Sequence, residues 1–337
     1  KQINNILINI LMSLTFKNIS NNISSNMLYS NGNKAEETNY IDNFTKIEYK
    51  SYFPNKNLSV LCEFKFKKFN KVTKIILDGI YKTWYENGNL EIECTYVDGF
   101  KNGQYKSFYD DKEIKLSKCC EYKNDKLINK FQKFNFNGSL KLECEYVDGK
   151  KTGKYTKYYE YPNYDKIYIS CSYNKNLLHG EYKSYYENGI IYENYNYENN
   201  KIIGILEIND STGRNTILSE GDITVWKAGR VILNDNELTD VYIELFVPSS
   251  AKRITPKDEL ETFKSRIEYG KIIKIVDSMN NNYQYAYSPV YTEKKLIYKV
   301  GEMVYSDDFD NDINTTCGSG INVHKFKEHC NIWFNKI

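Results

Sequence analysis

Between residues 47 and 207, hydrophobic and polar positions alternate with a period of two, and turn signals interrupt the alternation at regular intervals. In one such stretch the apolar side chains fall on one side of an extended chain and the polar ones on the other: Leu90, Ile92, Cys94 and Tyr96 against Glu91, Glu93 and Thr95. This alternation is typical of a half-buried β-strand. Asn87-Gly88 and its equivalents supply the positive φ that a hairpin turn requires. The pattern predicts a series of β-hairpins.

The hairpin pattern is an internal repeat. The segment Gly79-Ile-Tyr-Lys-Thr-Trp-Tyr-Glu-Asn-Gly88 recurs as Gly180-Glu-Tyr-Lys-Ser-Tyr-Tyr-Glu-Asn-Gly189, and shorter relatives lie between them. Six units begin near residues 47, 79, 103, 129, 153 and 180. A single hairpin cannot bury a hydrophobic face alone, so stability must come from neighbouring units. The sequence therefore predicts one elongated antiparallel sheet over residues 44–208.

The turns of this array differ in length. The first, third and fifth units replace Asn-Gly with longer loops, of which residues 160–165 form the longest. Insertions at one kind of turn place variable side chains along one edge, where repeat arrays usually bind partners. Tyr161 and Tyr164 in the longest loop are therefore candidate partner-binding residues. Neutral drift at a permissive turn is the alternative explanation.

The repeat motif resembles a known family. The pattern Gly-x-Tyr-Lys-x-Tyr-Tyr-Glu-Asn-Gly-x-Leu, followed by Tyr-x-x-Gly-Lys-x-x-Gly, is similar to MORN-type repeats, in the variant found in antitoxin-like and giant-virus proteins. The resemblance covers residues 47–207. It implies a single-layer sheet, contacts with proteins or lipids, and no catalysis.

Composition changes after residue 209, where the repeat stops. All four arginines lie beyond this point. Strand-like runs and two helix-like segments, Pro256–Phe263 with Thr255 as its N-cap and Asn322–Phe334, predict a small α+β domain over residues 213–337. Its motifs, among them Trp226-Lys227 and Cys317-Gly-Ser-Gly-Ile321, resemble a C-terminal domain of unknown function in repeat proteins of giant viruses and phages. That resemblance implies a viral context and no activity. Asn322 replaces the histidine usual in that family.

Charge and length set broad limits on the function. The 337 residues contain 46 Lys and Arg against 44 Asp and Glu, a formal charge of +2, which gives no global field for binding nucleic acid.

Residues 1–43 are predicted to be a polar, partly disordered lead-in, whose first 16 residues resemble a signal peptide only weakly. Asparagines break the apolar run, and Met12 is a possible alternative start. The predicted location is the cytoplasm, or a virion if the protein is viral.

One cysteine recurs at the same position of successive units. The members of this cysteine column are Cys62, Cys94, Cys120, Cys144 and Cys171. Equivalent positions in consecutive hairpins are two strands apart, about 9.5 Å at ~4.8 Å per strand. A disulfide needs Cα atoms within about 7 Å. The spacing therefore predicts reduced thiols that face inward as small hydrophobic groups, with Cys119 on the opposite side.

The remaining chemical candidates are weaker, and no cofactor or metal site is predicted. Cys317, His324, His329 and Cys330 form the only Cys/His cluster, but on a helix the two histidines would diverge by about 140°. A nucleophilic thiol at Cys317 is the less favoured alternative to a structural role. The aspartates at 307, 308, 310 and 312 lack the pattern of an EF-hand and are interpreted as a solvated acidic loop.

A basic, aromatic segment, Lys65–Lys74, is the last candidate. Lys65, Lys67 and Lys68 could contact phosphates or anionic lipid, but alternating Lys and Phe is also typical of an edge strand.

Three functions follow from the sequence. The leading one is a non-enzymatic scaffold that binds an unknown protein partner through its tyrosine-rich sheet, in a giant virus a structural or virus-factory component. The alternatives are a membrane-surface adaptor using Lys65–Lys74 and an unrecognised enzyme within 213–337. The oligomeric state stays open.

Overall fold

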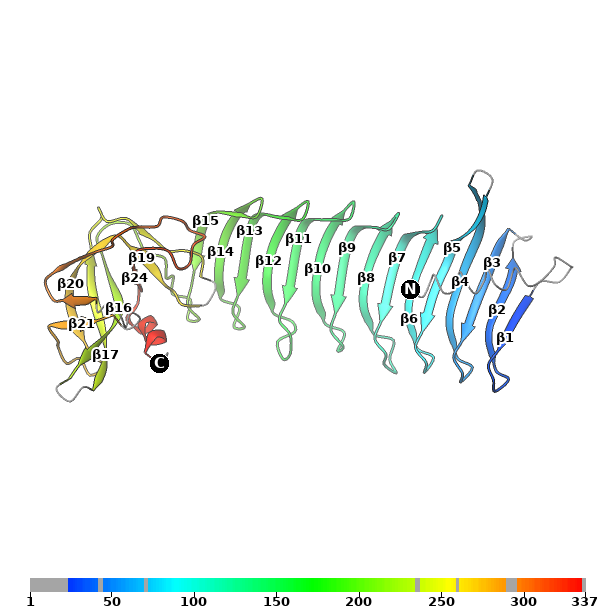
Figure 1. The fold of residues 1–337 in the computed structure, drawn as a ribbon, viewed down its shortest axis with the longest axis horizontal. Coiled ribbons are helices and arrows are strands. Elements are labelled where there is room, and N and C mark those ends of the chain that lie inside the picture. The colour runs from blue at the N-terminus through cyan, green and yellow to red at the C-terminus, as the bar shows by residue number, and fades with distance from the viewer. Residues whose placement is uncertain are drawn as a thin grey trace. The chain divides into compact units, whose positions relative to one another are not determined.

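The structure is a computed structural model, and it is built almost entirely of β-strands (Figure 1). It describes residues 24–41, 45–69, 72–233, 237–258, 261–288 and 296–334. The chain divides into two compact units, Lys1–Leu178 and His179–Ile337. The weak resemblance to a signal peptide falls outside the described residues.

Fifteen strands form one antiparallel sheet in chain order, each paired with the next (Figure 1). Their bounds are Ser24–Leu28 (β1), Lys34–Ile41 (β2), Lys46–Tyr52 (β3), Leu58–Phe69 (β4), Val72–Trp84 (β5), Leu90–Val97 (β6), Phe100–Phe108 (β7), Leu116–Lys123 (β8), Lys126–Phe134 (β9), Leu140–Val147 (β10), Lys150–Tyr158 (β11), Ile167–Asn174 (β12), Leu177–Tyr185 (β13), Ile191–Glu198 (β14) and Lys201–Ile208 (β15). The predicted mainly β fold with an elongated sheet of consecutive hairpins is confirmed.

The sheet begins earlier than the sequence predicted. β1 and β2 form a hairpin inside the segment predicted to be a polar, partly disordered lead-in, so residues 24–41 belong to the sheet. Their turn has the same hydrogen bonds as the Asn-Gly turns: the amide of Gly32 donates to the carbonyl of Tyr29 at 2.9 Å, as Gly88 does to Tyr85. The polar strand residues hid this copy of the repeat, because few of them are apolar.

Two kinds of turn alternate along the sheet. In the Asn-Gly turns, Gly88 has a φ of +93°, which fits a turn that ends in a left-handed glycine. At the other ends of the strands, two-residue turns such as Asp98-Gly99 have positive φ at both residues, the type I′ arrangement. Asn, Asp and Gly adopt this conformation at low cost, which explains their recurrence at these positions.

A β-bulge beside the Asn-Gly turns changes which side chains share a face. Thr83 pairs with Ile92 and Trp84 with Leu90, so Glu91 has no residue opposite it. Its carboxylate accepts a hydrogen bond of 2.9 Å from the hydroxyl of Thr83, which lies on the same face as Cys94. The prediction that places Glu91 on the opposite face is therefore wrong, because a bulge breaks the period of two.

The basic segment Lys65–Lys74 does not form an edge strand. β4 and β5 lie inside the sheet, between β3 and β6, and their hairpin extends beyond these neighbours. The pairing of β3 with β4 ends at Lys46 and Lys65, whereas β4 and β5 remain paired as far as Phe69 and Val72. Figure 1 shows this two-stranded extension above the other strands.

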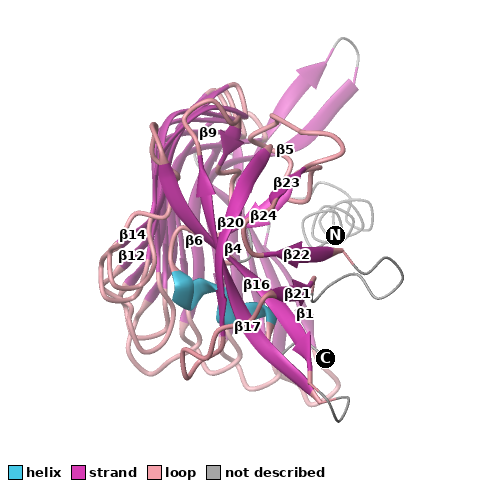
Figure 2. Ribbon diagram, turned by 90° about the vertical axis from the view of Figure 1, so that its left-hand side faces the viewer, coloured by secondary structure: helices cyan, strands magenta, loops and turns pink. Residues whose placement is uncertain are grey.

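The C-terminal domain packs two further sheets around its own core. A six-stranded sheet has the order β22-β21-β16-β17-β20-β23 and a three-stranded sheet the order β18-β19-β24. The strands are Ile223–Ile232 (β16), Leu238–Val247 (β17), Arg253–Ile254 (β18), Ser265–Ile267 (β19), Tyr269–Val276 (β20), Tyr285–Tyr287 (β21), Ile297–Lys299 (β22), Met303–Tyr305 (β23) and Ile321–Val323 (β24). In the described residues, one 3-10 helix, Lys327–Trp333 (η1), is the only helical element (Figure 2).

Both helices predicted in this domain need correction. Residues 322–323 belong to β24, and the C-terminal helix begins only at Lys327. In the predicted helix Pro256–Phe263, the described residues are not helical. The carboxylate of Asp258 there accepts hydrogen bonds from the backbone amides of Thr262 and Phe263. A short polar side chain thus competes with helical hydrogen bonding, as Asp commonly does.

Candidate functional site

One face of the repeat sheet is built from alternating tyrosine and cysteine side chains. Cross-strand pairing aligns Cys62, Tyr81, Cys94, Tyr105 and Cys120 in a single row over β4–β8. Over β9–β12 the row continues as Phe131, Cys144, Tyr155 and Cys171. Each small thiol therefore lies between two large rings, which lets the rings pack without crowding.

All five cysteines of the column are buried and free. Burial raises the pKa of the Cys94 and Cys171 thiols to about 11, and it raises that of Cys120 and Cys144 as well. Cys119, the neighbour of Cys120, is only half-buried and pairs with Gln132 and Lys106 on the other face. Since a thiol reacts as the thiolate, these buried groups are suited to packing and not to chemistry.

A second set of tyrosines lies beside this row and covers it. Their rings meet the first set edge-on: Tyr105 contacts Tyr122 with ring centroids 5.8 Å apart, and Tyr155 contacts Tyr173 at 5.6 Å. Such tilted contacts are the geometry that aromatic pairs prefer. The tyrosines are thus partly structural, but Tyr122, Tyr155 and Tyr173 keep part of their surface exposed to solvent.

Lysines lie among the tyrosines on this face. Lys118 pairs with Lys133 across β8 and β9, and Leu142 of β10 separates Lys133 from Lys157. Lys101 and Lys151 occupy equivalent positions in two repeats, opposite Tyr96 and Tyr146 respectively. We call this surface the Lys–Tyr face, defined by five lysines and the tyrosines beside them: Lys101, Lys118, Lys133, Lys151 and Lys157, with Tyr105, Tyr122, Tyr146, Tyr155 and Tyr173.

Most ammonium groups of this face lie over aromatic rings. The Nζ of Lys118 lies 4.2 Å from the ring centroid of Tyr105. Lys101 is 5.3 Å from the ring centroids of both Tyr105 and Tyr122, and Lys151 is 5.3 Å and 5.2 Å from those of Tyr155 and Tyr173. These distances are within the range of cation–π attraction. The rings hold the charges in place without neutralising them.

None of these five lysines forms an ion pair with a carboxylate in the part of the chain that the structure describes. Burial lowers the pKa of Lys118, and the positive charges of Lys101 and Lys133 lower it further. On the opposite face, by contrast, Lys82 pairs with Glu93 at 2.7 Å and Lys130 with Glu143 at 2.7 Å. The five lysines of the Lys–Tyr face therefore lack the carboxylate partners that Lys82 and Lys130 have on the opposite face.

The structure separates the residues predicted to bind a partner. Tyr161 and Tyr164 lie in the loop between β11 and β12, with ring centroids 6.1 Å apart, and Tyr161 is 81% exposed. Lys65 forms ion pairs with Asp78 and Asp98 at 2.8 and 2.7 Å, and Lys67 pairs with Asp98 at 3.0 Å. Lys68 is exposed near the tip of the β4–β5 hairpin. Asp78 and Asp98 thus neutralise two of the three lysines predicted to contact phosphates or anionic lipid.

The predicted Cys/His cluster is only partly assembled. His324 precedes η1, and its ring lies 6.5 Å from that of His329, so the prediction that the two diverge on one helix is wrong. The indole N–H of Trp333 donates to Nε2 of His324 at 2.8 Å, and Nδ1 of His324 lies 3.1 Å from the carbonyl of Phe263. His329 contacts the carboxylate of Asp210 at 3.3 Å. Protein groups therefore occupy three of the four ring nitrogens, and no metal-binding group of three or more such residues occurs among the described residues.

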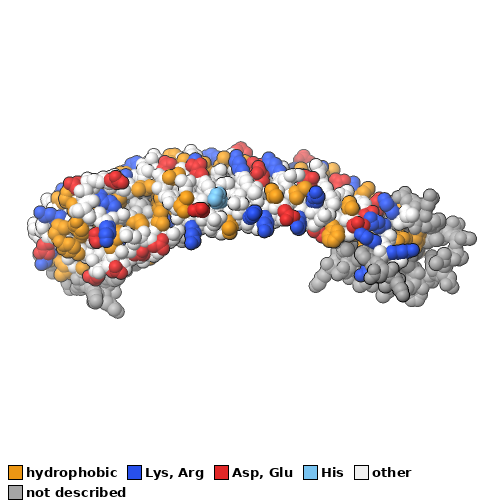
Figure 3. Space-filling model, turned by 90° about the horizontal axis from the view of Figure 1, so that it is seen from above, with side chains coloured by type: hydrophobic (Ala, Val, Ile, Leu, Met, Phe, Trp, Pro, Cys, Tyr) orange, Lys and Arg blue, Asp and Glu red, His pale blue; other side chains and the backbone are white. Residues whose placement is uncertain are grey.

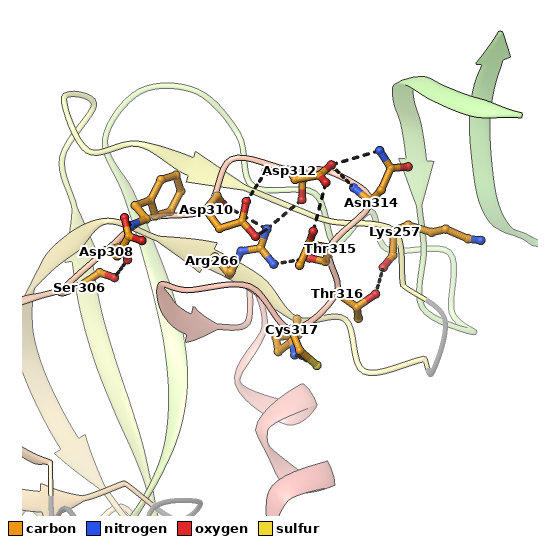
Figure 4. Close-up of polar contacts among 12 residues, drawn as sticks. Lys257, Arg266, Ser306, Asp308, Asp310, Asp312, Asn314, Thr315, Thr316 and Cys317 are labelled. Atoms are coloured by element: carbon orange, nitrogen blue, oxygen red, sulfur yellow. Dashed lines mark hydrogen bonds and ion pairs between the residues drawn. The ribbon is translucent and has the colours of Figure 1, made fainter. Parts of the chain in front are cut away.

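A buried arginine anchors the acidic loop through hydrogen bonds to its backbone (Figure 4). Arg266 of β19 is fully buried, and its guanidinium donates to the backbone carbonyls of Asp310, Asp312 and Thr315. The Asp310 carboxylate lies 3.9 Å from this guanidinium. The loop is therefore not simply solvated, as the sequence suggested, although Asp307, Asp308 and Asp312 are exposed.

Sequence reasoning missed the Lys–Tyr face. Lys133 and Lys157 occupy the column of Thr83 and Ser107, and a lysine at such a position looks like an ordinary solvent-facing residue. Aligning the repeats would have provided the signal: Lys118 occupies the column of Ile92, and Lys101 and Lys151 recur at one position.

Comparisons with known proteins agree with this architecture. Residues 77–98 and 178–205 match a MORN repeat variant, and residues 214–330 match a family of unknown function, DUF5758. The first two segments correspond to β5–β6 and to β13–β15. No curated protein sequence matches the chain. In the described residues, no helix has the length and apolar character needed to cross a membrane.

Proposed function

We propose that this protein is a non-enzymatic scaffold whose repeat sheet binds an acidic segment of a protein partner through the Lys–Tyr face. The observation that carries the proposal is the set of five lysines on one face without a carboxylate partner among the described residues. MORN repeats generally bind proteins or membranes, and the matches to them support a binding role. Neither matched family supplies a known catalytic activity.

The chemistry of the face favours a polypeptide as the partner. Tyrosine offers a large rigid contact area together with a hydroxyl group, and it is enriched in protein interfaces. Arginine, which binds phosphates in a bidentate manner, is absent from the face, since the four arginines are at positions 214, 230, 253 and 266. Carboxylates of an extended chain would supply the partners that these five lysines lack among the described residues.

The test measures binding of a fluorescent polyglutamate peptide to the full chain by anisotropy. Replacing Lys118, Lys133 and Lys157 with Gln should weaken binding by roughly tenfold, if each exposed pairing contributes about 0.5 kcal/mol. The matched control removes the same charge from elsewhere on the sheet, with Lys82, Lys130 and Lys154 replaced by Gln. The proposal fails if the two triple variants bind equally well, or if the wild-type chain does not bind the peptide.

The membrane-surface alternative predicts a different result. Its segment, Lys65–Lys74, carries ion pairs to Asp78 and Asp98 that reduce its attraction to an anionic surface. If the protein were a lipid adaptor, it would co-sediment with phosphatidylserine vesicles, and replacing Lys65, Lys67 and Lys68 with Gln would abolish this. The scaffold proposal predicts no such dependence.

We further propose that the scaffold belongs to a giant virus, as a structural or virus-factory component in the host cytoplasm or the virion. The support is the resemblance of the motifs in residues 217–337 to those of a domain in repeat proteins of giant viruses and phages. Quantitative mass spectrometry of purified virions against infected cytoplasm would test it. Absence of the protein from both fractions would contradict it.

A further inference from the structure

We propose that Cys317 is a reactive thiol, activated by the buried ammonium of Lys264, that undergoes exchange with disulfides. This site is separate from the Lys–Tyr face and does not depend on the proposed scaffold function. The Nζ of Lys264 donates to the Sγ of Cys317 at 3.6 Å. Cys317 is the exposed member of the eight cysteines, whereas six of the others are buried.

The position of Lys264 is unusual for a lysine. The residue is only 7% exposed, because it lies just before β19 in the interior of the C-terminal domain. Within the described part of the chain, the sulfur of Cys317 is the one hydrogen-bond partner that its ammonium has. A buried ammonium without an oxygen partner is costly, and a thiolate at its tip would offset that cost. The thiolate is the nucleophilic form of cysteine, and reactive cysteines are found beside positively charged groups such as this ammonium.

A second lysine contributes to the same positively charged environment. The pKa of Lys227 in β16 is lowered to about 8, chiefly by loss of solvent; Cys330 opposes this effect and the charge of Lys264 adds to it. The Nζ of Lys227 donates to the carbonyl of Asn322 at 3.2 Å, five residues after Cys317. No carboxylate pairs with either lysine among the described residues.

The loop that carries Cys317 is built to hold the thiol in place (Figure 4). It passes so close to Arg266 that a Cβ on Gly318 would lie 2.1 Å from the Asp310 carboxylate and 2.9 Å from the guanidinium. Gly320 has a φ of +145°, and a Cβ there would lie 3.1 Å from the Cβ of Arg266. A side chain at Gly318 would require Asp310 or Arg266 to move, and one at Gly320 would also strain the backbone. The Cys-Gly-Ser-Gly turn therefore fixes the sulfur above Lys264 while leaving it accessible.

The exchange reaction balances without a cofactor. The Cys317 thiolate attacks one sulfur of a small or peptide disulfide, a new S–S bond forms to Cys317, and the second sulfur leaves as a thiolate. The product is a mixed disulfide on Cys317, and the proton of the original thiol is released to solvent. Excess thiol reverses the reaction. The site is therefore a reversible modification site on the C-terminal domain.

The experiment treats the reduced full chain with oxidised glutathione at pH 7 and locates the adduct by peptide mass spectrometry. We expect the adduct on Cys317, formed at least about threefold faster than on the same cysteine in the urea-unfolded chain. Cys119, which is half-buried and faces away from the cysteine column, is the internal control thiol and should react more slowly. Cys317→Ser should abolish the main adduct.

Two variants then test the role of Lys264. Lys264→Met, which removes the charge but keeps an unbranched side chain, should slow the reaction at Cys317 at least threefold, whereas Lys264→Arg should retain most of the rate. Near-UV circular dichroism checks that both variants are folded. An unchanged rate in a folded Lys264→Met protein would overturn the proposal. If that variant does not fold, the comparison of folded and unfolded wild-type protein decides: equal rates at Cys317 overturn the proposal as well.

Discussion

The last hairpin of the repeat buries a carboxylate where other units have an aliphatic side chain. Glu193 occupies the position of Ile92, and it accepts hydrogen bonds from the hydroxyls of Tyr195 at 2.6 Å and Ser184 at 3.3 Å. Burial raises the pKa of Glu193 to about 7, against the lowering effect of the Tyr195 hydrogen bond. At mildly acidic pH the Glu193 side chain is therefore protonated in the folded state, whereas it is ionised in the unfolded chain.

This burial makes stability depend on pH in a direction that can be tested. Because the pKa is higher in the folded state, the contribution of Glu193 is fully present below about pH 4.5 and is lost as pH rises through 7. We compare the free energy of unfolding of Glu193→Gln with that of wild type at each pH. The variant should gain roughly 2–3 kcal/mol relative to wild type between pH 4.5 and pH 8. Urea unfolding at the two pH values measures this. A difference between variant and wild type that does not change with pH would contradict it.

The pH dependence of stability expected from His324 has the opposite sign to that expected from Glu193. Its burial lowers the pKa to about 3, and the Trp333 N–H occupies the nitrogen that would take the proton. The neutral ring therefore contributes stability that is present above about pH 6.5 and is lost as pH falls toward 3. In nuclear magnetic resonance spectra, the His324 ring signals should not titrate between pH 7 and 5 in the folded protein. In the urea-unfolded chain they should titrate normally, and titration in both states would show that the ring is not protected.

At the scale of strands and turns, tyrosine hydroxyls connect several of the hairpins to the next unit. The residue just before the turn donates to a backbone carbonyl 23 to 25 residues further on: Tyr85 to Phe108 at 2.9 Å, Tyr109 to Phe134 at 2.7 Å and Tyr186 to Asn209 at 2.9 Å. These bonds span adjacent units, so they are part of the coupling between neighbours on which a repeat array depends. They also give the recurrent Tyr-Tyr pair a structural reason.

Removing one of these hydroxyls should have a measurable effect. Tyr109→Phe deletes the bond to Phe134 but keeps the ring contact with Phe136, whose centroid is 5.4 Å away. We expect a loss of about 0.5–1.5 kcal/mol in the free energy of unfolding, the usual net value of one hydrogen bond. Tyr161→Phe is the control, because that side chain is exposed in a loop. Equal stability of both variants would mean that these bonds do not couple the repeats.

The sequence was most informative where local chemistry alone determines structure. Alternation and Asn-Gly turns predicted the hairpins because both depend only on neighbouring residues. β1–β2 escaped notice since few of their strand residues are apolar. The expected helix at 256–263 failed because Asp258 binds the amides of Thr262 and Phe263 instead. Part of the Lys–Tyr face could have been found by aligning the repeats, because Lys101 and Lys151 recur at one position. The pairing of Lys264 with Cys317 was not predictable, since only the tertiary fold brings these two residues together.

At the scale of the whole molecule, the net charge conceals how the charges are arranged. Figure 3 shows positive and negative side chains interspersed on the surface it displays, and the formal total is only +2. The five lysines of the Lys–Tyr face nevertheless lack partners among the described carboxylates. A surface of this kind acts at short range, because at physiological salt charges are screened within about 8 Å. Binding to the face should therefore depend on contact and weaken as salt is added.

A partner that crosses the sheet could also reach the long loops at the ends of the strands. Residues 160–165 connect β11 to β12, two strands that carry part of the Lys–Tyr face, and they expose the ring of Tyr161. Replacing this loop with the Asn-Gly turn of other units should leave the fold intact, since that turn already joins β5 to β6. We expect weaker retention of the proteins that co-purify with the chain, measured by quantitative mass spectrometry. Because the double variant Tyr161→Ser/Tyr164→Ser keeps the loop length, it separates a role of the rings from a role of the backbone. Retention that is unchanged in both variants would leave the sheet face as the binding surface and remove these two tyrosines from it.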